Sequence, residues 1–108
     1  MNKGEIWFID LSGRKGHEQS GKRPSIVVGR ANGLTTVIPL TANLNRANLP
    51  FTHTVIPSSI NGLHDVSIAL VFQISTCDDS FFINKIGKIS KEDEHAVDEL
   101  IMDFLKLG

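Results

Sequence analysis

The chain has 108 residues, the length of one domain, and 41% of them are hydrophobic, which is enough for a single core. No apolar run approaches the ~18 residues of a membrane span, and no apolar stretch precedes a small-residue cleavage site near the N-terminus. We therefore expect a cytoplasmic protein with no membrane partner. Cys77 is the only cysteine, which excludes an internal disulfide and a zinc site built from cysteines.

The net charge of −1 conceals an uneven distribution. Residues 1–54 hold seven Lys and Arg against three Asp and Glu, a balance of +4, whereas residues 55–108 have a balance of −5. A basic half fits a polyanionic partner such as a nucleic acid. An ordinary surface opposite a solvated acidic helix face explains the distribution equally well, so charge alone leaves both interpretations open.

The first half of the chain predicts strands separated by polar loops. Runs of strand-forming residues predict strands over residues 5–9, 25–30, 35–40 and 52–56. Residues 10–23 form a polar loop of roughly 14 residues, and loops of that length in small domains are usually functional or disordered. Residues 43–50 form a second polar loop. Pro39, near the end of its strand, favours an edge position or a bulge.

The second half changes character toward its end. The apolar run over residues 66–74 predicts one long strand, and residues 81–83 predict a short one. Ser90 followed by Asp93 is a helix N-cap signal, and apolar residues then recur at helical spacing. We therefore expect an amphipathic helix over residues 91–107. Together these elements predict a mainly β fold, a small antiparallel β-barrel with a C-terminal α-helix.

Arg23 stands at the junction between the first polar loop and the next strand, where Pro24 biases it toward an extended backbone. A guanidinium fixed at a sheet edge suits a phosphate or a carboxylate. Thr41 follows the next strand, and in an antiparallel pair these two positions lie at the same edge. The two side chains are therefore predicted to converge on one ligand atom as a phosphate clamp. A surface salt bridge and a strand-end threonine are the alternative.

Other kinds of site have little support in the sequence. The four histidines, at positions 17, 53, 64 and 95, are not at metal-ligand intervals, and the glycines match no phosphate-binding or dinucleotide loop. No Ser lies in a nucleophile elbow, and the acidic neighbours of Cys77 disfavour its thiolate. We expect neither a metal nor a cofactor. The remaining candidates for a catalytic role are Glu18, Arg23 and Thr41, together with His17 on the first loop.

The first loop also carries a motif. Gly-His-Glu-Gln-x-Gly-x-Arg-Pro spans residues 16–24, and it follows Gly-Glu-Ile-Trp at residues 4–7. The pattern continues with Val-Ile-Pro-Leu-Thr at 37–41, Leu-Pro-Phe at 49–51 and Gln-Ile-x-Thr at 73–76. In this arrangement the chain resembles the MazF/PemK family of toxin endoribonucleases, with most likeness to the Kid branch in the first third. The resemblance spans nearly the whole chain, as a single toxin domain over residues 1–108.

The resemblance implies a fold and an activity. The fold is an SH3-like antiparallel β-barrel that works as a homodimer. Members cut single-stranded RNA, often mRNA, at short sequences without a metal, and a cognate antitoxin blocks them. The toxin–antitoxin complex is expected to bind DNA. The RNA supplies its own nucleophile, the 2′-hydroxyl, so the expected products are a 2′,3′-cyclic phosphate and a free 5′-hydroxyl.

The resemblance also implies roles for individual residues. Arg23 stabilises the transition state and acts as a general acid, Thr41 hydrogen-bonds the scissile phosphate, and Glu18 serves as a base or an RNA contact. The positions expected to contact or handle RNA are Glu5, His17, Gln19, Lys22, Asn43 and Gln73.

Three positions depart from the family pattern. Kid-type toxins have an Arg and an Asp, two residues apart, where this chain has Leu70 and Phe72. Many MazF members have an Arg where this chain has Ser75. A MazF-type mechanism based on Arg23 and Thr41 is therefore expected rather than a Kid-type one. Two alternatives stay open: a non-catalytic gyrase poison like CcdB, disfavoured by a C-terminal end without Trp, and a degenerate member that only binds RNA or antitoxin.

Overall fold

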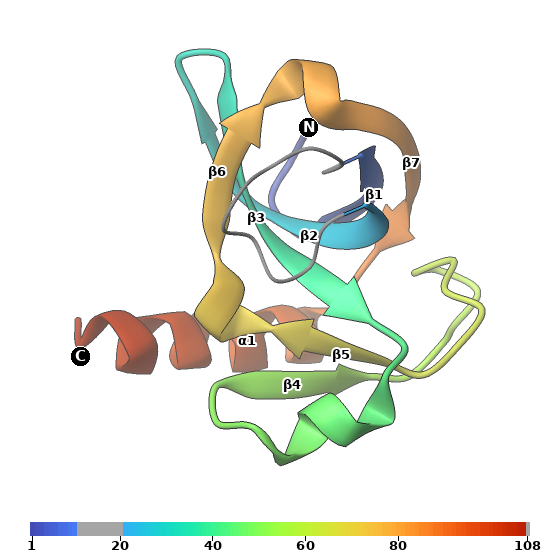
Figure 1. Ribbon diagram of the computed structural model, residues 1–108, viewed down its shortest axis with the longest axis vertical. Helices are drawn as coiled ribbons and strands as arrows, with labels where there is room; N and C mark the ends of the chain where they lie inside the picture. The colour runs from blue at the N-terminus through green and yellow to red at the C-terminus, as the bar shows by residue number, and fades with distance from the viewer. Residues whose placement is uncertain (11–20, 108) are drawn as a thin grey trace.

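The computed structural model describes residues 1–10 and 21–107, and these form a sheet packed on one C-terminal helix (Figure 1). The strands and the helix are β1 (Glu5–Asp10), β2 (Lys22–Ala31), β3 (Leu34–Thr41), β4 (Thr52–Val55), β5 (Ser67–Leu70), β6 (Ser75–Asp78), β7 (Phe82–Lys88) and α1 (Lys91–Leu105). Three short 3-10 helices connect them: η1 (Leu44–Asn48), η2 (Val71–Gln73) and η3 (Asp79–Phe81).

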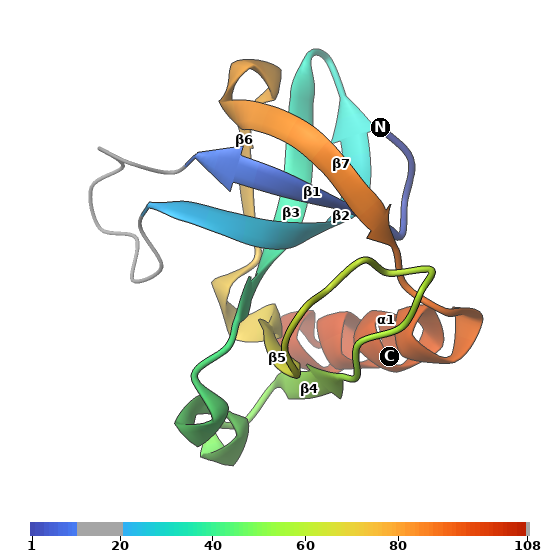
Figure 2. The ribbon, with the colours of Figure 1, turned by 90° about the vertical axis from the view of Figure 1, so that its right-hand side faces the viewer.

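The sheet is antiparallel throughout its described pairs, in the order β4-β5-β3-β2-β1-β7, with β6 also pairing with β3. The predicted fold class, mainly β and antiparallel with a C-terminal α-helix, is confirmed. The predicted β-barrel differs in one detail, because the described sheet is open rather than closed. Its two ends, β4 and β7, do not pair: the β4–β5 hairpin packs on α1 instead (Figure 2).

Pro39 does not lie on an edge strand. β3 is central, pairing with β6 up to Val37 and with β5 from Leu40 onward. Pro39 falls where the neighbour changes, which accommodates a residue that has no N–H to donate. The bulge of the β2–β3 pair lies between Val27 and Gly29, away from the proline.

The predicted strand over residues 66–74 is also wrong. The strand ends at Leu70, η2 follows, and β6 begins at Ser75. In η2 the Val71 N–H donates to the Phe51 carbonyl at 3.1 Å, and the Ile74 N–H donates to the Val71 carbonyl at 3.0 Å. This turn moves the chain from one end of β3 to the other. Both strands and the turn contain apolar residues, so hydrophobicity alone gives no sign of the break.

The C-terminal helix is confirmed, over Lys91–Leu105 rather than residues 91–107. The Ser90 hydroxyl accepts the Asp93 N–H at 3.1 Å, the predicted N-cap. Lys106 has left-handed backbone angles and ends the helix. In place of the short strand predicted over residues 81–83, β7 extends over Phe82–Lys88. The sequence did not indicate this length because Asn84 and Lys85 interrupt the apolar pattern. No helix in the described part of the chain is long and apolar enough to cross a membrane.

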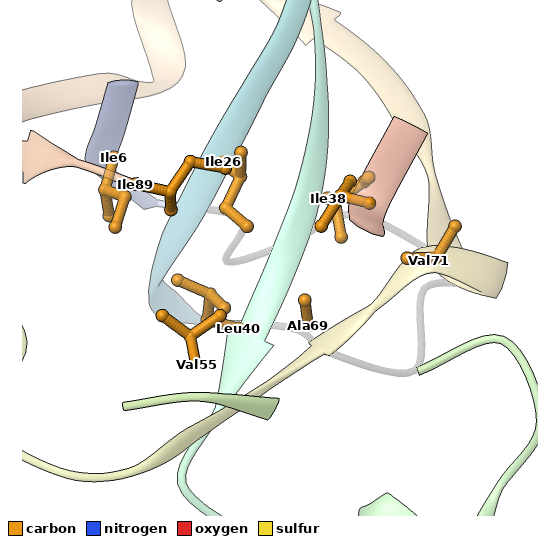
Figure 3. Close-up of a cluster of buried hydrophobic side chains, with 9 residues drawn as sticks. Ile6, Ile26, Ile38, Leu40, Val55, Ala69, Val71 and Ile89 are labelled. Atoms are coloured by element: carbon orange, nitrogen blue, oxygen red, sulfur yellow. The ribbon is translucent and has the colours of Figure 1, made fainter. Parts of the chain in front are cut away.

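The central strands are apolar on both faces. One cluster contains Ile6, Ile26, Ile38 and Leu40 with Val97 of α1, and Figure 3 shows most of its side chains converging between the strands. The other cluster contains Ile9, Val27, Val37 and Cys77, with Trp7, Phe81 and Phe82 packed against it. Since successive strand residues face opposite sides, neighbours such as Ile26 and Val27 serve different clusters. Both faces of these central strands are therefore buried in hydrophobic clusters.

Candidate active site at the ends of β2 and β3

A tight hairpin brings the start of β2 and the end of β3 to one edge of the sheet. Asn32 and Gly33, with φ of 58° and 77°, form its turn, and positive φ at both positions is typical of a type I′ hairpin. The pairing runs to Ser25 opposite Pro39. Arg23 and Thr41 lie two residues beyond this last pair, on β2 and β3 respectively. The predicted antiparallel pairing of the two strands is confirmed, whereas convergence of the two side chains on one ligand atom stays a prediction.

Arg23 lines a cleft of about 380 Å³. One wall consists of residues near the strand ends, Phe8, Arg23, Pro24, Leu40 and Ala42. The facing wall comes from the loop between β4 and β5 and contains Gly62, Leu63, His64 and Asp65. The Nε of Arg23 is buried and has no hydrogen-bond partner among the described residues. A buried guanidinium N–H without a partner is costly, and the positive charge of Arg23 makes the cleft suitable for an anion.

Thr41 is more enclosed than the clamp hypothesis assumed. It is only 4% exposed, and it is not among the residues that line the cleft. Its Oγ1 accepts the Asn43 N–H at 3.1 Å, which leaves its own O–H available as a donor. The Asn43 side chain in turn accepts the Asn45 N–H at 3.1 Å and caps η1. These bonds fix the direction in which the chain leaves β3.

The other residues predicted to take part are distributed unevenly. His17, Glu18 and Gln19 lie outside the described residues. Lys22 is exposed at the first position of β2, and Gln73 is half-buried at the end of η2. Of Lys22 and Gln73, only Lys22 is exposed, and it lies next to Arg23 in the sequence.

Glu5 is buried and has a structural role. One of its carboxylate oxygens accepts the Trp7 indole N–H at 2.9 Å and the Asn2 N–H at 3.1 Å, and the other lies 3.2 Å from the Lys85 ammonium. The Trp7 hydrogen bond, with help from Asn2 and Lys85, lowers the pKa of Glu5 from 4.5 to about 2, although burial opposes this. Glu5 thus ties β1 to the N-terminus and to β7.

This lowered pKa predicts a pH-dependent stability. Because the folded-state pKa lies below 4.5, the ionised Glu5 carboxylate stabilises the fold above that pH, and this stabilisation is lost as the pH falls from 4.5 toward about 2. Urea unfolding at several pH values should show a steeper loss of the free energy of unfolding in the wild type than in Glu5→Gln. The control is Glu92→Gln, at an exposed carboxylate on α1. Equal pH dependence in the wild type and Glu5→Gln would refute this role.

The three positions that depart from the Kid and MazF patterns are part of the packing. Leu70 is fully buried in β5, and Phe72 lines a small apolar pocket of about 270 Å³ with Leu49, Pro50 and Phe51. The Ser75 hydroxyl is buried, with no hydrogen-bond partner in the described part of the chain. None of these side chains offers an acid or a base to the cleft that Arg23 lines.

The sequence did not indicate that His64 and Asp65 would share a cleft with Arg23. Both lie in a loop more than twenty residues beyond the end of β3, and no local pattern reveals where a loop docks. The one available signal is the Asn61-Gly62 dipeptide, which marks a tight turn just before them. Within residues 1–10 and 21–107, no group of three or more His, Cys, Asp and Glu side chains is arranged to hold a metal ion.

Comparison with known proteins agrees with this fold. The family model described as "PemK-like, MazF-like toxin of type II toxin-antitoxin system" matches residues 2–105. Endoribonuclease EndoA of Bacillus subtilis is 33% identical, over 99% of this chain and 96% of the relative. Endoribonuclease MazF9 of Mycobacterium tuberculosis is 31% identical, over 99% and 98%. Among solved structures, MazF from Deinococcus radiodurans superposes with a TM-score of 0.82 at 21% identity, covering 99% of this chain and 97% of that one.

The chain therefore belongs to the PemK-like, MazF-like family of toxins of type II toxin–antitoxin systems. The curated relatives in this comparison are named endoribonucleases, so the resemblance inferred from the first loop is confirmed at the level of the family.

Proposed function

We propose that this chain is a metal-independent endoribonuclease that cleaves single-stranded RNA, including mRNA, at short sequences. The observation that carries the proposal is that Arg23 lines a cleft at the sheet edge and that its buried Nε has no hydrogen-bond partner among the described residues. The family supports it, because the relatives that match almost the whole chain are named endoribonucleases. A phosphodiester is the anion that both observations favour.

The proposed chemistry uses the RNA's own nucleophile. Glu18 takes the proton from the 2′-hydroxyl, the 2′-oxygen bonds to phosphorus, and the bond between phosphorus and the 5′-oxygen breaks. Arg23 neutralises the charge that develops on the non-bridging oxygens, and Thr41 donates a hydrogen bond to the phosphate. The contacts that orient the RNA are assigned to His17, Gln19, Lys22, Asn43 and Gln73, with Glu5 supporting the scaffold.

The direct test is digestion of a long single-stranded RNA by the purified protein in the presence of EDTA. We expect cleavage at a limited set of sequences, because the protein rather than a metal neutralises the phosphate. RNA that stays intact, or cleavage that EDTA abolishes, would overturn the proposal. RNA binding without cleavage would instead support a degenerate member of the family.

We also propose that the chain acts in the cytoplasm as a homodimer and binds a cognate antitoxin, with DNA binding by the resulting complex. Solved relatives include an "Endoribonuclease in complex with its cognate antitoxin from Mycobacterial species", with a TM-score of 0.79 at 17% identity over 100% of this chain and 97% of that one. We expect an acidic antitoxin segment to bind the basic half of this chain, because residues 1–54 have a net charge of +4.

Binding of that antitoxin should weaken as salt rises, because exposed charges are screened beyond about 8 Å at physiological ionic strength. The measurement is the dissociation constant of the cognate antitoxin at ionic strengths between about 0.05 and 0.5 M. Lys22→Ala should reduce the salt dependence, since Lys22 is exposed beside the cleft. An affinity that does not change with salt would contradict this mode of binding.

A further inference from the structure

The cleft that holds Arg23 has a second wall with its own chemistry. The loop between β4 and β5, over residues 56–66, lies beside β7 (Figure 2). It contributes His64 and Asp65 to the same cleft of about 380 Å³ that the Arg23 side chain lines. Both side chains are exposed. The preceding part of the loop is fixed by hydrogen bonds of the Asn61 side chain.

Asn61 holds the loop in shape from inside. It is 3% exposed, and its side-chain amide donates to the Ile56 carbonyl at 2.9 Å. Its Oδ1 accepts the N–H groups of Ser58 and Leu63, both at 3.0 Å. One buried side chain thus closes the loop on both sides of the turn, immediately before His64.

Two glycines dock the loop against β7. Gly62 has φ of +70°, and a Cβ there would lie 2.5 Å from the Ile86 carbonyl oxygen. A Cβ on Gly87 would lie 2.3 Å from the Ile60 carbonyl oxygen. The Lys88 N–H donates to that same carbonyl at 3.2 Å. Only glycine permits so close an approach of two backbones. The loop is therefore held in one position against β7, which also fixes the position of the His64 backbone.

The proposed reaction needs a proton donor that Arg23 supplies poorly. The leaving 5′-oxygen must gain a proton, whereas an arginine guanidinium stays protonated in proteins and serves best as a fixed charge. The other titratable side chains that line the cleft, within the described residues, are His64 and Asp65. An aspartate is ordinarily anionic at neutral pH, whereas histidine exchanges a proton between about pH 5 and 8.

We propose that His64 is a catalytic residue, the general acid that protonates the leaving 5′-oxygen. This inference rests on the proposed ribonuclease function. As the bond between phosphorus and the 5′-oxygen breaks, its electron pair takes the proton of the His64 imidazolium. The products are a free 5′-hydroxyl and a neutral imidazole, which regains a proton from water. Arg23 and Asp65 are the charged residues that line the cleft together with His64 among the described residues.

The first test is the rate of cleavage as a function of pH. His64→Gln should lower kcat by about 10²–10⁴-fold with little change in KM, and should lose the fall in rate that the wild type shows on the alkaline side. His95→Gln is the matched control, because His95 is an exposed histidine on α1 that pairs with Glu99 away from the cleft. It should cleave as the wild type does.

The second test removes the need for an acid. An RNA with sulfur in place of the 5′-oxygen at the mapped cleavage site has a leaving group that departs without a proton. His64→Gln should cleave this substrate within about tenfold of the wild-type rate, which also shows that the variant is folded. If His64→Gln stays slow on the sulfur substrate, or cleaves ordinary RNA with the rate and pH profile of the wild type, the acid role is refuted. In those cases cleavage by the wild type leaves the proposed function intact, and a wild type that cuts neither substrate refutes both.

Discussion

Arg23→Ala is expected to lower the single-turnover rate of RNA cleavage by about 10²–10³-fold, the usual cost of removing one electrostatic donor from an active site. Arg23 is the only Lys or Arg among the described residues that line the cleft, and its buried Nε has no hydrogen-bond partner among them. Arg23→Lys should recover part of the rate, because an ammonium keeps the charge and loses the planar pair of donors. The measurement is a time course with enzyme in excess over a labelled single-stranded RNA.

Arg30→Ala is the matched control for this prediction. Arg30 lies on the same strand at its other end, where it forms an exposed ion pair with Asp79. Its removal should leave the cleavage rate near that of the wild type and cost at most about 1 kcal/mol of stability. If the two alanine variants lose activity equally, general loss of positive charge explains the effect and Arg23 has no special position.

Ile38→Ala is expected to lower the free energy of unfolding by about 2–5 kcal/mol, a large share of the stability of a small domain. Ile38 is fully buried in the central strand β3, and it packs in the cluster that joins the sheet to α1. Truncation leaves a cavity that strands paired on both sides cannot easily close. Urea unfolding followed by circular dichroism measures the effect.

Ile83→Ala provides the comparison, since Ile83 lies on β7 with half of its surface exposed. The same chemical change should there alter the free energy of unfolding by no more than about 0.5 kcal/mol. Equal losses in the two variants would mean that β3 does not occupy the centre of the core, which would contradict the sheet order described above.

Local sequence signals predicted the elements that position Arg23. Pro24 and the apolar run after it predicted β2, which begins at Lys22 rather than at residue 25, and the expected antiparallel pairing of β2 with β3 is confirmed. Ser90 marked the start of α1 through its hydroxyl, which caps the helix in the structure. Each of these signals acts through the residue's own backbone or its nearest neighbours, so one sequence suffices to recognise it.

Structural features that depend on residues distant in the sequence could not be predicted from local signals. At the break after Leu70, η2 shifts the register of the chain on β3 by three residues between β5 and β6, and apolar residues on both sides conceal it. Pro39 suggested an edge strand because proline has no N–H to donate within a sheet. Its place in the central strand β3 is possible because β3 changes neighbour there, from β6 to β5, which only the tertiary structure reveals. His64 looked isolated because the docking of its loop on β7 is set by Gly62 and Gly87, twenty-five residues apart in the sequence.

Mass spectrometry of the ends of the RNA fragments tests the ribonuclease proposal most directly. After digestion in EDTA, upstream fragments should end in a 2′,3′-cyclic phosphate and downstream fragments should begin with a 5′-hydroxyl, because the 2′-hydroxyl is the proposed nucleophile. Fragments with a 3′-hydroxyl and a 5′-phosphate would show that water attacks the phosphate instead. That result would contradict the mechanism built on Arg23.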